Sequence, residues 1–258
     1  MFSTTVQPEI LSLFSATGSE PLQLFSVSWD SSLPADSFVH SLQDNTSLPA
    51  PPEPCVLIKA PMRQTDNSDN SETGQSGLCL AQTVLHIQSP TLQTTYIRCP
   101  ANKASQLGLK HPWIHLQVRN MGREWSFEVG LVDRVGRVGV VRLSTFQKEP
   151  RLTPSTPPLL HLPLSFPSIS SQPLTAWSTV TLHIPSLLPH FSSAALVARG
   201  HDGLPVPLAM SILPSGAFSH LAFVKVYATC RLRRIWFSHA GPSKQAPWEF
   251  ELYGDEYR

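Results

Sequence analysis

The sequence has no apolar run that approaches the roughly 18 residues required by a membrane-spanning helix. Charged residues are also scarce, at 14% of the chain, and the four cysteines lie far apart, without the close spacing of a metal site. The first twenty residues lack a basic start followed by an apolar stretch, so we expect no signal peptide and therefore reduced thiols. These absences favour a soluble intracellular protein and argue against a membrane as its partner.

Catalytic and cofactor motifs are missing too. The sequence contains no GxSxG nucleophile motif and no glycine-rich phosphate loop after a strand. His111 and His115 are four residues apart, which on an extended strand separates them by about 13 Å, too far for one metal ion. Cys99 and Cys230 are expected to be buried small hydrophobic residues, not a metal or redox pair. We therefore predict no enzyme, no cofactor and no metal site.

Proline, by contrast, is abundant at 25 residues, a composition typical of strands joined by long loops. Residues 113–120 and 125–133 alternate apolar and polar side chains, as a strand does when one face lies in the core. Residues 133–137 contain a glycine and predict the hairpin after the second of these strands. We predict an all-β fold, an antiparallel β-sandwich of jelly-roll type, in which 185–193 is the one helical candidate. Further strands are expected at 21–27, 83–88, 94–99, 137–144, 158–164, 177–184, 221–228, 230–238 and 248–253.

The chain reads as a single domain over 1–258, interrupted by three segments. Residues 30–80 are acidic and rich in Pro, Ser and Asn, so we expect a disordered insertion. Residues 152–175 form a predicted Pro/Ser-rich loop and residues 194–216 a Gly/Pro-rich loop. Seven acidic residues against two basic ones give 30–82 a net charge of −5, whereas ten basic against four acidic give 83–152 a net charge of +6. Such a basic body favours an acidic partner surface, and the acidic segment could weaken that preference.

Several motifs occur in an order that resembles the domain of the cilia- and flagella-associated protein 20 family. They are "TTYIRCPA" at 94–101, "LGLK" at 107–110, "FEV" at 127–129 and "CRLRRIWFS" at 230–238, and the opening "LSLFSATGSEPLQLF" fits as well. The resemblance covers about two-thirds of the chain. It implies a β-sandwich without enzymatic activity that sits on axonemal doublet microtubules, at the inner junction where the B-tubule closes on the A-tubule. There, family members contact tubulin and a neighbouring junction protein, the parkin co-regulated product, and other members are centriole-associated. Because this chain adds acidic and Pro-rich insertions, it resembles a divergent paralogue.

The motif at 230–238 also raises a question about its arginines. Apolar residues occupy even positions up to Leu232 and odd positions from Ile235, a phase change that predicts a β-bulge at Arg233–Arg234. With a bulge, Arg231 and at least one of its two neighbours point outward and could form a basic ridge for the acidic surface of tubulin. In the alternative, these arginines pair internally with Glu249 or Glu251 of the following segment.

A second basic set lies in predicted loops and strand ends, where a lattice-binding protein would spread its charges so that many weak contacts add up. Its members are Lys103, Lys110, Arg119, Arg123, Arg134 and Arg137, and the alternative is an ordinary solvated surface. Lys110 and Arg123 join Arg231, Arg233 and Arg234 as leading tubulin-binding candidates.

The predicted function is a non-enzymatic structural protein that binds doublet or centriolar microtubules and helps assemble or stabilise the axoneme, contributing to ciliary motility. Its expected partners are tubulin and a neighbouring inner-junction or centriolar protein, in the cytoplasm and cytoskeleton, at the axoneme or basal body. One alternative is an adaptor that binds a partner protein or, less favoured, nucleic acid through a basic β-face. The other is a carbohydrate-binding module, because Trp113 and Trp236 oppose their apolar neighbours in phase and could be exposed.

Overall fold

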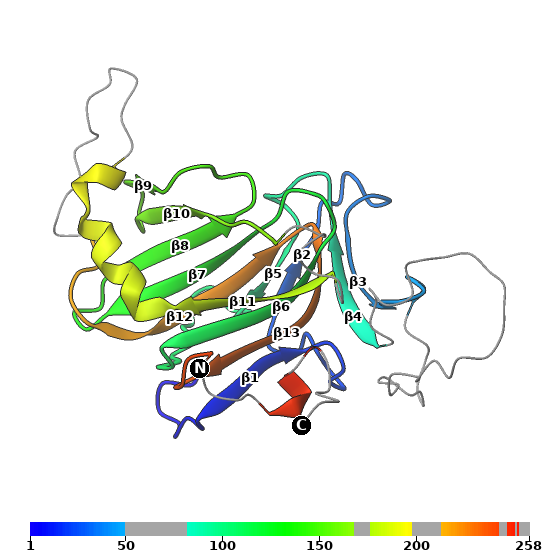
Figure 1. Ribbon diagram of the computed structural model, residues 1–258, viewed down its shortest axis with the longest axis horizontal. Coiled ribbons are helices and arrows are strands. Elements are labelled where there is room, and N and C mark those ends of the chain that lie inside the picture. The colour runs from blue at the N-terminus through cyan, green and yellow to red at the C-terminus, as the bar shows by residue number, and fades with distance from the viewer. Residues whose placement is uncertain (50–81, 168–175, 198–212, 243–246, 251, 253–258) are drawn as a thin grey trace, which may run out of the picture.

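The computed structural model describes residues 1–49, 82–167, 176–197, 213–242, 247–250 and 252, which form two β-sheets packed face to face (Figure 1). Sheet A has the order β11-β6-β13-β4-β3, with β1 also paired to β13, and sheet B has the order β2-β5-β12-β7-β8-β10-β9. The predicted all-β sandwich is confirmed. The strands are β1 (Ile10–Ser15), β2 (Ser26–Ser28), β3 (Phe38–Gln43), β4 (Thr83–Gln88), β5 (Tyr96–Cys99), β6 (Trp113–Asn120), β7 (Ser126–Asp133), β8 (Val138–Ser144), β9 (Arg151–Thr153), β10 (Leu159–Pro163), β11 (Trp177–His183), β12 (Phe218–Tyr227) and β13 (Cys230–Ser238).

The interior lies between the two sheets and follows from the alternation of the strands. Ile114, Leu116 and Val118 of β6 are fully buried, as are Phe127 and Val129 of β7. Full burial of such a side chain contributes about 1.5–3 kcal/mol relative to leaving it in water. A one-residue slip would turn every one of these residues outward, so the alternation fixes the register of the strands.

A β-bulge lets β13 keep both halves of its apolar pattern in the core. Cys230 and Leu232 are fully buried before the bulge, and Ile235 and Phe237 are fully buried after it. The pairing of β13 with β6 shifts register between Leu232 and Arg234. The phase change in the sequence therefore predicted the bulge correctly.

A 3-10 helix, η2 (Ile184–Ser192), packs against the sandwich beside β8 and β12 and confirms the helical candidate at 185–193 (Figure 1, yellow). It buries Ile184, Leu188 and Phe191. A Cβ atom at Gly139 of β8 would lie 2.8 Å from the Phe191 ring, so the packing of η2 requires a glycine there. Sheet B is not purely antiparallel, because β10 runs parallel to β8.

The structure corrects the predicted insertion at 30–80. Its first part is ordered, since β3 pairs with β4 along its whole length and forms an edge of sheet A. Local sequence gives β3 little apolar alternation, so long-range pairing decides its conformation. Residues 50–80 lie outside the described residues, as do 168–175 and 198–212 of the other two predicted loops. The described parts of those loops include β9, β10 and the short 3-10 helix η3 (Ala194–Leu196).

Two predicted strands also change. Residues 248–250 of the predicted strand at 248–253 form a 3-10 turn, η5 (Trp248–Phe250), that begins after Pro247. The N–H of Phe250 closes this turn by donating to the carbonyl of Pro247 at 2.9 Å. Of the predicted strand at 21–27, only its last two residues belong to β2. The sequence predictions also missed β1, which pairs with the second half of β13.

Candidate partner-binding surface

Arg231 lies on the outer face of sheet A, yet it is only 5% exposed and is bonded inside the protein. Its guanidinium donates to the carboxylate of Asp44 at 2.8 Å, to the backbone carbonyl of Asp44 at 2.7 Å and to the hydroxyl of Ser47 at 2.5 Å. The buried Asp44 carboxylate also accepts hydrogen bonds from Arg119 at 3.0 Å and from the indole of Trp177 at 2.9 Å. Arg231 is therefore held by contacts within the fold and shares the Asp44 carboxylate with Arg119.

The next two arginines of β13 are also held by internal contacts. Arg233 is 8% exposed and donates to the side-chain oxygens of Gln82 at 2.9 Å and Gln117 at 2.6 Å. Burial, together with the neighbouring Arg234, lowers the pKa of Arg233 to about 10. Arg234 is half-buried, and its guanidinium lies 5.1 Å from the centre of the Phe250 ring in η5. Such a cation–ring contact is attractive.

The predicted exposed ridge is therefore wrong for Arg231 and Arg233, although the bulge that was expected to create it is present. The internal alternative, which named Glu249 or Glu251, holds for Arg231 and Arg233, whose described partners are instead Asp44, Ser47, Gln82 and Gln117. Glu251 lies outside the described residues. Among the described residues, Glu249 acts on Arg234 and opposes the lowering of its pKa by burial. The physical reason is that the loop after β3 and the η5 turn cover this part of the sheet. No alternation within β13 can reveal such a cover.

The η5 turn also decides the environment of Trp236. Trp236 is 5% exposed, because its ring stacks on His115 at 4.8 Å and also contacts Phe250 at 5.2 Å. Trp113 is half-buried beside His183. Burial of Trp236 corrects the expectation that it could be exposed, and it removes one of the two rings on which the carbohydrate hypothesis rested.

The second basic set is divided by the structure. Arg119 is bonded to Asp44, and Arg137 donates to the carbonyl of Leu213 and the hydroxyl of Ser215. The other four side chains are exposed and lie in three separate loops, those between β5 and β6, between β6 and β7 and between β7 and β8: Lys103, Lys110, Arg123 and Arg134.

The outer face of sheet B carries a basic surface that the sequence predictions missed. The pairing of four neighbouring strands places Arg98 of β5 opposite Lys225 of β12, Lys225 opposite Glu128 of β7, and Glu128 opposite Arg142 of β8. These four residues, which we call the sheet B row, therefore lie at paired positions on four neighbouring strands and form a line across the sheet. Neighbouring strands are about 4.8 Å apart, so the row is about 14 Å long.

Aromatic rings flank this row. The Lys225 Nζ atom lies 3.7 Å from the centre of the Tyr96 ring and 4.2 Å from that of Tyr227. The Arg98 guanidinium lies 4.9 Å from the centre of the Phe223 ring. Rings at these distances attract cations through their electron-rich faces. The rings thus position the charges of the row without neutralising them.

The row has more positive charge than its one carboxylate can balance. Glu128 is 6% exposed and already accepts two hydrogen bonds from Arg142, at 2.7 and 2.5 Å. The row therefore has a net charge of +2, and the exposed Lys103 acts on Lys225 as a further cation. An acidic partner would find unbalanced positive charge here on half-buried side chains, whereas Arg231 and Arg233 of sheet A are buried.

Lys225 shows the consequence of this crowding. Burial and the nearby cations Arg142, Lys103 and Arg98 together lower its pKa to about 8, against the opposing effect of Glu128. Burial also raises the pKa of the Tyr227 hydroxyl. Glu128 alone does not offset burial and the cations, and a second carboxylate from a ligand would favour the charged amine.

The alternation in the sequence is enough to place some residues of this basic surface on the outer face. Tyr96 and Arg98 alternate with the fully buried Ile97 and Cys99 in the motif at 94–101, and so belong to the outer face of β5. The same reasoning places Lys225 on the outer face of β12. Only the order and register of the strands show that these positions lie side by side.

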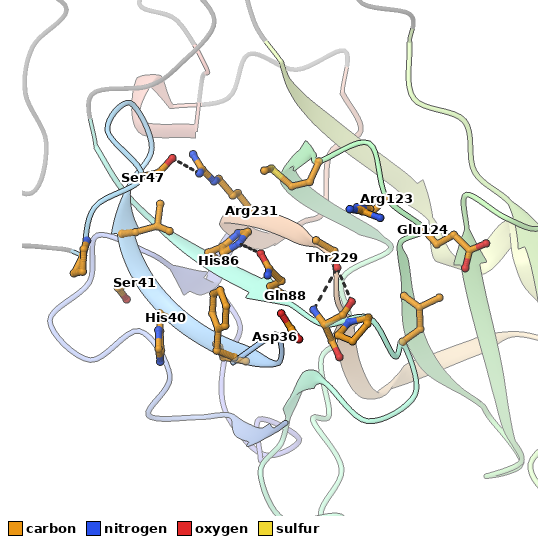
Figure 2. Close-up of a pocket in the computed structure, with 18 residues that line it drawn as sticks. Asp36, His40, Ser41, Ser47, His86, Gln88, Arg123, Glu124, Thr229 and Arg231 are labelled. Atoms are coloured by element: carbon orange, nitrogen blue, oxygen red, sulfur yellow. Dashed lines mark hydrogen bonds between the residues drawn. The ribbon is translucent and has the colours of Figure 1, made fainter. Parts of the chain in front are cut away.

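A groove of about 1160 Å³ lies on the outer face of sheet A, between β3, β4, the start of β13 and the β6–β7 loop (Figure 2). On its walls, Arg231 is bonded to Ser47, and His86 is bonded to Gln88 at 3.0 Å. Burial lowers the pKa of His86, so its ring is neutral at physiological pH. The other residues that line the groove carry charges of both signs, so the groove selects neither cations nor anions.

The described residues contain no group of three or more His, Cys, Asp or Glu placed to hold a metal ion. Cys99 and Cys230 are free and fully buried, as predicted, and burial raises the pKa of the Cys99 thiol to about 12. Cys55 and Cys79 lie outside the described residues. In the described part of the chain, no helix has the length and apolar character needed to cross a membrane.

Comparison with known proteins agrees with the motifs. Residues 78–188 match the family model described as the CFA20 domain. The chain is 27% identical over 175 residues to cilia- and flagella-associated protein 20 from Chlamydomonas reinhardtii, which covers 67% of this chain and 75% of that protein. It is 22% identical over 254 residues to the proteins of the same name from Caenorhabditis briggsae and Caenorhabditis elegans, covering 98% of this chain and 91% of each. The resemblance to the cilia- and flagella-associated protein 20 family is therefore confirmed, as a similarity at 22–27% identity to proteins of that name.

Proposed function

We propose that this chain is a non-enzymatic structural protein of cilia or flagella that binds microtubules and stabilises the axoneme. Its relatives are named as cilia- and flagella-associated proteins, which supports a ciliary role. The observation that carries the binding proposal is the sheet B row, a net-positive surface built on the middle strands of a rigid sheet. Tubulin, as an acidic partner, would complement that charge.

The proposal relies on many weak contacts, not on one strong pair. An exposed ion pair contributes about 0–1 kcal/mol and is screened by salt. Exposed cations in the loops, such as Lys110, Arg123 and Arg134, would add contacts around the row. Binding should therefore weaken steadily as the salt concentration rises, and removing a few row cations should have a large effect at intermediate salt.

Co-pelleting with taxol-stabilised microtubules across a salt series tests this function. The row variant replaces the row cations Arg98 and Lys225, together with the nearby Lys103, with glutamine. It spares Arg142 because its loss would leave Glu128 buried without its partner. We expect wild type to pellet in a salt-sensitive manner and the row variant to lose most of its binding.

A charge-matched variant, Lys110→Gln/Arg123→Gln/Arg134→Gln, controls for the loss of three positive charges. Equal loss in both variants would indicate that net charge, and not the row, drives binding. Loss only in the loop variant would move the contact to the loops that the sequence predicted. Failure of the wild type to pellet even at low salt would refute microtubule binding.

A further inference from the structure

We infer that the outer face of sheet B is a binding site for an extended, carboxylate-rich peptide segment, with Lys225 at its centre. Only the identity of the protein that supplies the segment rests on the proposed function. The sheet B row is about 14 Å long, a length that four or five residues of extended chain would cover at about 3.4 Å per residue. Acidic side chains in such a segment would meet Arg98 and Lys225 in turn.

The geometry favours carboxylates over nucleobases as the recognised groups. A base would need an open ring face on which to stack. Here Lys225 lies against the Tyr96 and Tyr227 rings, and Arg98 lies against the Phe223 ring. Tyr227 is also only 6% exposed and meets Tyr96 edge to face, with the ring centres 5.7 Å apart. The cations, and not the rings, therefore face the ligand.

Charge complementarity identifies the ligand as acidic. The one carboxylate that faces Lys225 from the neighbouring described strands is Glu128, which shares its single negative charge with Arg142 through two hydrogen bonds to Oε1. The other groups around the amine are the cations Arg98 and Lys103 and the two tyrosine rings. A ligand carboxylate beside Nζ would supply the counter-charge that this arrangement lacks.

Binding should take up a proton, which gives the site a signature of its own. In the free protein, burial and the adjacent cations lower the pKa of Lys225 to about 8, so near pH 8 about half of the amines are neutral. An arriving carboxylate favours the charged form and raises that pKa. At pH 8, the complex should therefore contain up to about half a proton more than its free components.

Isothermal titration calorimetry of the full chain with poly-L-glutamate tests the inference. Titrations at pH 8.0 in two buffers with different ionisation enthalpies measure the protons taken up. We expect wild type to bind with proton uptake, and Lys225→Gln to bind at least tenfold more weakly without it. Lys148→Gln removes a lysine from the exposed loop between β8 and β9 and should change neither quantity.

The Lys225→Arg variant separates recognition from a merely structural role. It keeps the positive charge, but a guanidinium stays protonated at pH 8. Binding should therefore stay within about threefold of wild type, whereas the proton uptake should disappear. Circular dichroism and urea unfolding confirm that each variant is folded before its titration is interpreted.

Three results would overturn the inference. They are unchanged binding of poly-L-glutamate by Lys225→Gln, proton uptake that persists in Lys225→Arg, and tighter binding of single-stranded poly-uridylate than of poly-L-glutamate at the same salt. Microtubules are not part of this titration, so the two proposals can fail separately. Loss of poly-L-glutamate binding with pelleting intact would refute only the peptide site, and the reverse would refute only microtubule binding.

Discussion

Replacing Asp44 with asparagine should destabilise the fold more than any ordinary change in a loop. The Asp44 side chain is fully buried, and that of its partner Arg231 is only 6% exposed, with 2.8 Å between Oδ1 and Nη1. Removing one member of a buried ion pair leaves the other charged and without compensation, at a cost of about 3–5 kcal/mol. Asparagine keeps one carbonyl acceptor for the hydrogen bonds but not the charge. We therefore expect the free energy of unfolding to fall by about 3–5 kcal/mol.

Urea unfolding followed by tryptophan fluorescence measures this change, and Asp36→Asn is the matched control. Asp36 lies just before β3 and Asp44 just after it, but the Asp36 side chain is exposed, so we expect a change within about 0.5 kcal/mol. The double variant Asp44→Asn/Arg231→Met removes both charges and should cost less than the sum of the single variants. If Asp44→Asn costs no more than Asp36→Asn, the internal pairing of the β13 arginine is refuted, and residues 30–49 behave as the disordered segment that the sequence predicted.

Three further predictions concern single residues. Lys225→Met should raise the free energy of unfolding by about 1–2 kcal/mol at pH 7, because the charged amine is disfavoured in the fold. This figure is discounted for solvent screening at a half-buried site. The gain should shrink between pH 8 and 10.5, as the wild-type amine loses its proton first in the folded state and then in the unfolded state. Burial lowers the pKa of His115 to about 4, so the unfolded chain binds a proton at this residue first as the pH falls. The free energy of unfolding should therefore decrease as the pH drops from 6.5 to 4, and it should decrease less steeply in His115→Gln. The imidazole NMR signals of His115 in the wild type should titrate near pH 4, and a midpoint near 6.5 would contradict its burial. Gly108→Ala should cost about 1–3 kcal/mol by urea unfolding, because φ is +76° and the new Cβ would lie 2.7 Å from the backbone nitrogen of Ser3; Gly122→Ala, also at positive φ but with nothing within 4 Å, isolates the backbone strain from the clash.

Local pattern was enough to predict the sandwich, several of its strands and the bulge in β13. Alternation acts between neighbouring residues, so it assigns Leu116 to the core and Gln117 to the outer face without knowledge of the partner strands. The bulge followed from the same rule, since a phase change within one strand can be read along that strand. Strands without clear alternation, such as β1 and β3, were missed because their pairing partners lie far away in the sequence.

Whether an outward arginine is free or bonded was decided only by the tertiary structure. Arg231 and Asp44 are 187 residues apart in the chain, and no spacing rule connects them. Arg98 and Lys225 are likewise brought together only by the pairing of β5 with β12. The sequence therefore determined which side chains leave the core, because that depends on local geometry. Their exposure and their partners depend on the packing of distant segments, which buried Arg231 and Arg233 on sheet A and left the cations of the sheet B row half-buried around one carboxylate.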